Sequence, residues 1–163
     1  MNTIKKEHKE FIDDLLKKIK SNIPDECTLE IAILKGHILL EYYMDKIIEL
    51  LSESDINISK TNFTFKHKVD ILKILGITPD YMNTYDVLLK FNSIRNQLAH
   101  RLEFDRVKVD DFILLAMKST SITKESITTD EQRAKMIRLI IPYLTGYIST
   151  TFSMKSEMKV DKK

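Results

Sequence analysis

Glycine and proline are scarce in this chain, with only three of each among 163 residues. Sheet folds need a turn signal about every 8 to 12 residues, and these two residues supply most such signals. Their scarcity therefore favours long helices joined by few loops. The length suits one apolar core rather than two. We predict an all-α fold, a bundle of five to six helices.

Apolar residues recur at intervals of three and four along several segments, which is the pattern of amphipathic helices. It predicts a first helix over about residues 3–21 and a longer second one over about residues 28–53. A third helix is predicted in "FTFKHKVDILKILG", where Gly76 suits the left-handed stop position. The positions of this helix expected to face inward are Val69, Leu72 and Leu75.

The second half of the chain carries helix-start signals. Thr78 and Pro79 predict the start of a fourth helix that runs to about Glu103, because proline fits the first helical turn. A fifth helix is predicted to start at Val109 or Asp110.

A sixth helix is predicted to start near Thr128, which has capping-box spacing to Glu131, and to continue past a kink at Pro142. We predict that all 163 residues form one domain, with a core over residues 3–104 and C-terminal helices over residues 109–157.

Charge and cysteine content narrow the function classes. The 26 basic and 24 acidic residues give a net charge of +2, so any nucleic-acid contact must be local. The single Cys27 forms no internal disulfide and no zinc pattern. No segment approaches the roughly 18 apolar residues of a membrane span, and no signal peptide is evident. We predict a cytoplasmic protein without a membrane segment, cofactor or metal.

The stretch "FNSIRNQLAHRLEF" places an arginine on an apolar helix face. Arg95 falls within the helical sector of its apolar neighbours, and a buried guanidinium is unfavourable by several kcal/mol unless a carboxylate, phosphate or hydrated cleft receives it. Glu41 is the candidate carboxylate. Such a pair would either hold the bundle together or orient Arg95 towards a phosphate. The apolar neighbours are Leu88, Phe91, Leu98 and Leu102.

Asn96 and His100 lie four residues apart, so the amide could orient the imidazole. Arg95 and His100 are splayed by about 140° on one helix, a difficulty that two copies meeting across a two-fold axis would remove. Histidine can accept and donate protons and arginine can stabilise a charged phosphate, which suffices to cleave RNA without metal. Alternatively, His100 only caps its helix, whose C-terminus favours a cation.

Two further arginines follow the motif. Arg101 and Arg106 could track an RNA backbone, or could pair with the nearby Glu103 and Asp105 as exposed ion pairs.

His37 lies four residues before Glu41. This spacing could suggest metal, but a third ligand is not evident, and we expect a hydrogen-bonded pair on one helix.

The string "FNSIRNQLAHRL" resembles the R-N-x-x-x-H signature of the HEPN superfamily (higher eukaryotes and prokaryotes nucleotide-binding domain), here Arg95, Asn96 and His100. The segments "KGHILLEYYMDKIIELL" and "FTFKHKVDILKILGI" also resemble bacterial members. The resemblance covers about residues 30–104 and leaves residues 107–163 outside it.

The resemblance implies a helical bundle that dimerises with the motif at its interface. It implies metal-independent RNA cleavage, with Arg95 and His100 catalytic and Asn96 as polar support, in a toxin or phage-defence effector with a possible antitoxin partner. It does not extend to His37 or Glu41. The superfamily also contains non-catalytic members, so a dimeric interaction or regulatory protein of mannitol-repressor-like type is the alternative.

Overall fold

The fold is described from a computed structural model, which describes residues 13–14, 17–18, 21–52, 57–78, 83–101 and 104–160, with backbone only from residue 155. The described residues contain helices and no strand, which confirms the all-α prediction. The helix predicted over residues 3–21 lies largely outside them. The elements are α2 (Leu29–Leu51), η1 (Ile58–Lys60), α3 (Phe65–Ile74), α4 (Thr84–His100), α5 (Arg106–Ala116), η3 (Lys124–Ser126) and α6 (Asp130–Val160).

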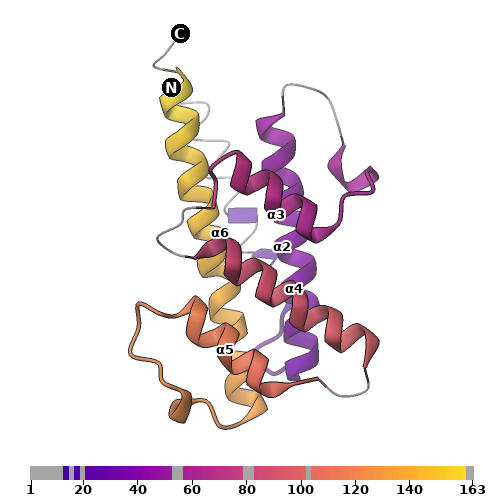
Figure 1. The fold of residues 1–163 in the computed structure, drawn as a ribbon, viewed down its shortest axis with the longest axis vertical. Helices are drawn as coiled ribbons and strands as arrows, with labels where there is room; N and C mark the ends of the chain where they lie inside the picture. Colours follow the sequence, from indigo (N-terminus) through magenta and orange to yellow (C-terminus); the bar gives the residue numbers. More distant parts are fainter. Residues whose placement is uncertain are drawn as a thin grey trace.

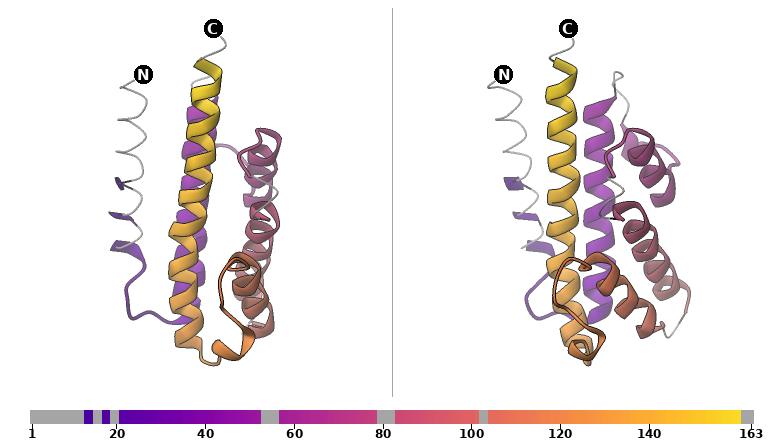
Figure 2. Two further views of the ribbon diagram at one scale, coloured as in Figure 1. Left: turned by 90° about the vertical axis from the view of Figure 1, so that its left-hand side faces the viewer. Right: turned by 60° about the vertical axis from the view of Figure 1, so that its left-hand side comes forward.

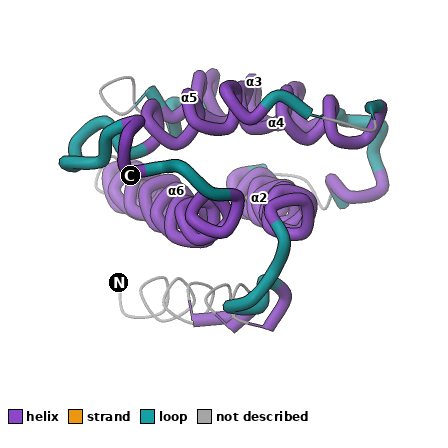
Figure 3. The backbone as a smooth tube through the Cα atoms, turned by 90° about the horizontal axis from the view of Figure 1, so that it is seen from below, coloured by secondary structure: helices purple, strands orange, loops and turns teal. Residues whose placement is uncertain are grey.

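The helices α2 to α6 form two layers. α2 and α6 run side by side, and α3, α4 and α5 lie across one face of that pair (Figures 1 and 3). Figure 2 shows the two layers edge-on. α2 is the central element, because it packs against α3, α4 and α6. None of the described helices is both long enough and apolar enough to cross a membrane.

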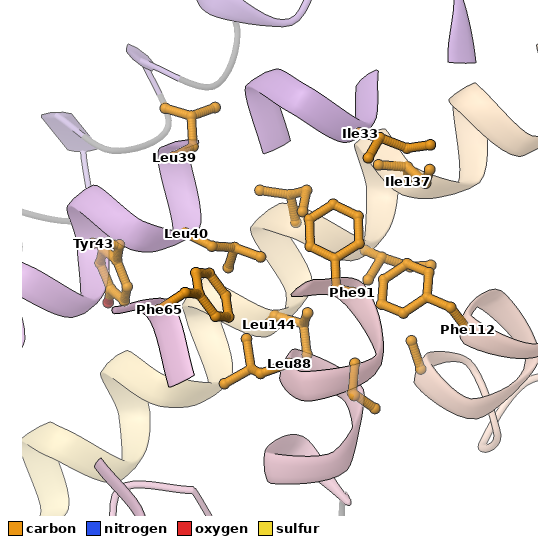
Figure 4. Close-up of a cluster of buried hydrophobic side chains, with 14 of the residues drawn as sticks. Ile33, Leu39, Leu40, Tyr43, Phe65, Leu88, Phe91, Phe112, Ile137 and Leu144 are labelled. Atoms are coloured by element: carbon orange, nitrogen blue, oxygen red, sulfur yellow. The ribbon is translucent and has the colours of Figure 1, made fainter. Parts of the chain in front are cut away.

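Side chains from the helices α2 to α6 meet in one apolar core (Figure 4). Phe91 of α4 stacks on Phe112 of α5, with ring centroids 4.8 Å apart. Gly36 lets α2 approach its neighbours closely, since an added Cβ would lie 3.1 Å from the Ile141 side chain and 3.3 Å from the Phe91 ring. The core therefore fixes α4 against α2, α3 and α5 and leaves its opposite face at the surface.

The start of α2 and the end of α3 match the prediction. The side chain of Thr28 caps α2 by accepting a hydrogen bond from the Ile31 N–H. Gly76 follows α3 with a φ of 65°, the left-handed stop. Leu75 was predicted to face inward, which is wrong: it caps the end of α3 and is exposed. The other two predicted inward positions are fully buried.

Two helices start away from the predicted residues. α4 begins at Thr84 rather than at Thr78, because Asn83 adopts a left-handed conformation with a φ of 49° immediately before it. α5 begins at Arg106, three residues before the earlier of the two predicted starts, because the Asp105 carboxylate accepts a hydrogen bond from the Val107 N–H at 2.9 Å and caps the helix.

α6 begins one residue later than the Thr128–Glu131 spacing predicted. Thr129 and Gln132 form the reciprocal hydrogen bonds of a capping box instead. The helix continues through Pro142, and the hydroxyl of Thr145 donates to main-chain carbonyls of the preceding turn.

Candidate functional site

An open cleft of about 520 Å³ lies on the exposed face of α4. Its described lining contains two permanent cations, an imidazole and several neutral polar side chains, but no carboxylate. Such a surface suits an anionic ligand. The lining residues are Lys66 of α3 together with Leu89, Asn92, Ser93, Asn96, Gln97, His100 and Arg101.

Helical periodicity brings the polar residues of α4 together. Asn92, Asn96 and His100 lie four residues apart and therefore share one face of the helix. The opposite face packs into the core through Phe91 and Ile94. Burial of one face thus holds the other in a fixed position at the surface.

His100 is the last residue of α4 and is exposed in the cleft. The predicted bond from Asn96 to His100 is wrong for the described chain, since no hydrogen bond joins the two side chains. The Asn96 Oδ1 instead accepts a hydrogen bond from the Arg95 guanidinium at 3.1 Å. The arginine therefore orients the amide, and the imidazole remains free to meet a ligand.

Arg95 is half-buried and does not line the cleft. It lies at the edge of the core face, which is centred on fully buried neighbours such as Leu88 and Phe91. The predicted ion pair between Arg95 and Glu41 is wrong within the described chain. Glu41 instead accepts a hydrogen bond from the Lys68 ammonium at 2.9 Å.

Lys68 of α3 is 4% exposed and forms ion pairs with two carboxylates of α2. Its Nζ lies 2.9 Å from Glu41 Oε1 and 2.7 Å from Asp45 Oδ1. Burial opposes the charge of Lys68, but the hydrogen bonds to Asp45 and Glu41 outweigh it, so its pKa is raised. Glu41 therefore does not support Arg95 as predicted. It belongs to a cluster with Lys68 and Asp45 that holds α3 against α2.

His37 of α2 is 3% exposed and connects this cluster to the cleft. Its Nε2 lies 3.0 Å from Asn92 Oδ1, and its ring stacks on Phe65 with centroids 4.2 Å apart. The predicted hydrogen bond to Glu41 is wrong, because His37 Nδ1 lies 3.9 Å from the carboxylate. Burial lowers the pKa of His37, and the positive charge of Arg95 adds to this effect.

The two arginines after the motif differ. Arg101 is exposed and lines the cleft. Arg106 lies outside it, where its guanidinium binds both carboxylate oxygens of Asp130 at 2.7 to 3.0 Å. The ion pair predicted as one alternative for Arg106 thus forms, but with Asp130 rather than Asp105.

A larger cleft of about 810 Å³ lies where α2 and α6 begin. Acidic residues such as Glu30 and Glu131 line it together with Lys135 and Arg138, and Arg138 pairs with Asp25. Its charges are therefore mixed. In the described ranges, no group of three or more histidine, cysteine, aspartate or glutamate side chains is arranged to hold a metal ion.

No family model matches the sequence, and no curated protein or solved structure is significantly similar to it. Function is therefore inferred from the residues and their geometry.

Proposed function

We propose that the protein is a metal-independent endoribonuclease of HEPN type that acts as a homodimer at the α4 cleft, in a toxin or phage-defence role. The observation that carries this proposal is the composition of the cleft. An exposed imidazole lies among cations and amide groups, and the described lining contains no carboxylate. RNA is a polyanion, and such a surface favours its backbone.

His100 supplies the proton chemistry. As the general base, an imidazole takes the proton of a ribose 2′-OH, and the 2′ oxygen then attacks the adjacent phosphorus. The bond from phosphorus to the 5′ oxygen breaks, and this oxygen takes a proton from a general acid. The products are a 2′,3′-cyclic phosphate and a 5′-hydroxyl. Arg101 and Lys66 attract the backbone, although Lys66 also pairs with Asp70.

A second copy of the chain would complete the site. The described lining of one chain contains a single imidazole, whereas the reaction uses both a base and an acid. A two-fold partner would bring the second His100. Such an interface would also give Arg95 a route to the phosphate, in addition to its bond to Asn96 within one chain.

A non-catalytic interaction or regulatory module is the second candidate. The observation that favours it is the position of Arg95, which is half-buried, hydrogen-bonded to Asn96 and outside the cleft lining. In that case the motif serves dimer stability.

Incubation of the protein with single-stranded RNA in EDTA tests the proposal. The native chain should release products with 2′,3′-cyclic phosphate ends, and His100→Ala should cleave about 10² to 10⁴-fold more slowly. Arg106→Ala is the matched control and should cleave normally, because Arg106 is held by Asp130. Absence of cleavage over a range of RNAs, or equal rates for native protein and His100→Ala, contradicts the nuclease.

The second candidate predicts a different result. Arg95→Ala would then dissociate the dimer in light scattering, while the native chain shows no RNA cleavage.

A further inference from the structure

We propose that Asn92 is a further substrate-binding residue of the α4 cleft and that buried His37 is the positioning residue that turns its amide NH2 group towards the RNA. Neither residue belongs to the Arg-Asn-His motif. The inference rests on the proposed function, because it takes RNA as the ligand of the cleft.

The hydrogen bond between α2 and α4 sets the orientation of the amide. His37 Nε2 lies 3.0 Å from Asn92 Oδ1, across 55 residues of sequence. An amide oxygen only accepts, so Nε2 must carry the proton. With its oxygen held by the buried ring, the amide of Asn92, a residue that lines the cleft, has its two N–H donors left for a ligand.

The surroundings of His37 hold this tautomer. The ring stacks on Phe65 and lies 6.3 Å from Phe91, so its plane is fixed. Burial lowers the pKa of His37, which keeps the imidazole neutral with one donor and one acceptor. Its Nδ1 lies 3.9 Å from the Glu41 carboxylate, beyond hydrogen-bond distance, as expected for a nitrogen without a proton.

Asn96 shows the same arrangement one turn later. Its Oδ1 accepts from Arg95, so its NH2 group is also left for the cleft. Asn92, Asn96 and His100 thus form a row of polar groups spaced about 6 Å along the helix axis. Two amides oriented by groups behind them make a surface that donates to phosphate oxygens and offers few acceptors.

Four substitutions separate orientation from packing. Asn92→Asp keeps the acceptor for His37 but replaces the donor with a negative oxygen. His37→Gln keeps a side-chain N–H near the position of Nε2, whereas His37→Leu fills the site without a donor. Asn57→Asp adds the same charge at an exposed residue outside the cleft, whose side chain makes no capping hydrogen bond.

The measurement is fluorescence anisotropy of a labelled single-stranded RNA with the full chain and each variant, after melting curves verify folding. Asn92→Asp and His37→Leu should each weaken binding about tenfold or more, the effect of losing one hydrogen bond to a charged group. His37→Gln and Asn57→Asp should bind within about threefold of the native chain. NMR of the His37 ring should show the proton on Nε2.

The outcomes distinguish the two proposals. A native chain that does not bind RNA overturns the proposed function and this inference with it. Native binding that Asn92→Asp leaves unchanged overturns the inference alone. A proton on Nδ1 of His37, or a His37→Gln variant that binds as weakly as folded His37→Leu, overturns the positioning role. Should His37→Leu fail to fold, the NMR result and the Asn92→Asp and His37→Gln affinities decide.

Discussion

Two polar regions of this protein differ in how their charges are satisfied. Between α5 and α6, buried Arg133 binds both oxygens of Asp110 at 2.7 and 3.0 Å, and Asp130 bridges Arg133 to Arg106. At the end of α4, Arg101 lines a cleft whose described residues include no carboxylate. The first region is closed and stabilises the fold, whereas the second is open and suits a ligand.

The largest expected effect follows from breaking the closed region. Arg133→Met leaves Asp110 buried without its counter-charge, and we expect the free energy of unfolding to fall by about 3 to 5 kcal/mol. Urea unfolding measures this loss. RNA affinity, measured where the variant is folded, should not change.

The double variant Arg133→Met with Asp110→Leu is the control, because it removes both charges. It should be more stable than Arg133→Met alone. A single variant that loses less than about 1 kcal/mol, or a double variant that is less stable still, contradicts a structural role for the pair.

The pH dependence of stability tests the buried His37, which lies beneath the open cleft. The pKa of His37 is lowered in the folded chain, chiefly by burial, so the unfolded chain binds its proton more readily. Stability from this group is present above the ordinary histidine pKa of about 6.5 and is lost as pH falls from there towards the folded pKa. The slope should reach at most about 1.4 kcal/mol per pH unit.

Urea unfolding at a series of pH values measures this slope in the native chain and in His37→Gln. The substitution should remove the contribution of His37. Equal slopes in both proteins would show that His37 titrates alike in the folded and unfolded chains.

A smaller effect is expected at the motif arginine. Arg95→Ala removes the hydrogen bond to Asn96 and should lower stability by about 0.5 to 1.5 kcal/mol. Thermal melting measures this loss of stability, and RNA anisotropy on the same samples measures affinity. Arg95→Ala and Asn96→Ala should reduce RNA affinity to a similar extent, and the double variant should lose no more than either single variant. Independent, additive losses would contradict the coupling between the two residues.

Local patterns were enough to predict the helices but not their partners. α2 starts next to Thr28 and Gly76 ends α3 as predicted, because each boundary depends on a few adjacent residues. The start of α5 was predicted too late because Asp105, which caps the helix, was interpreted as a possible ion-pair partner of an arginine.

The site residues were found only in part for a physical reason. His100 and Asn96 follow from one helix face, but the bond from His37 to Asn92 joins two helices and 55 residues of sequence. Arg95 was the predicted partner of Glu41, but the packing of α3 against α2 brings Lys68 to the carboxylate instead. Spacing along one helix carries no information on such choices.

The most direct test of the open cleft is the salt dependence of single-stranded RNA binding by the native chain, Arg101→Ala and Arg106→Ala. Arg101→Ala should bind more weakly and reduce the slope of log affinity against log salt by about 0.7, the value for one phosphate contact. Arg106→Ala should match the native chain, because Asp130 already holds that guanidinium. Equal slopes for the native chain and Arg101→Ala, or a loss only in Arg106→Ala, would contradict the assignment of the α4 cleft to RNA.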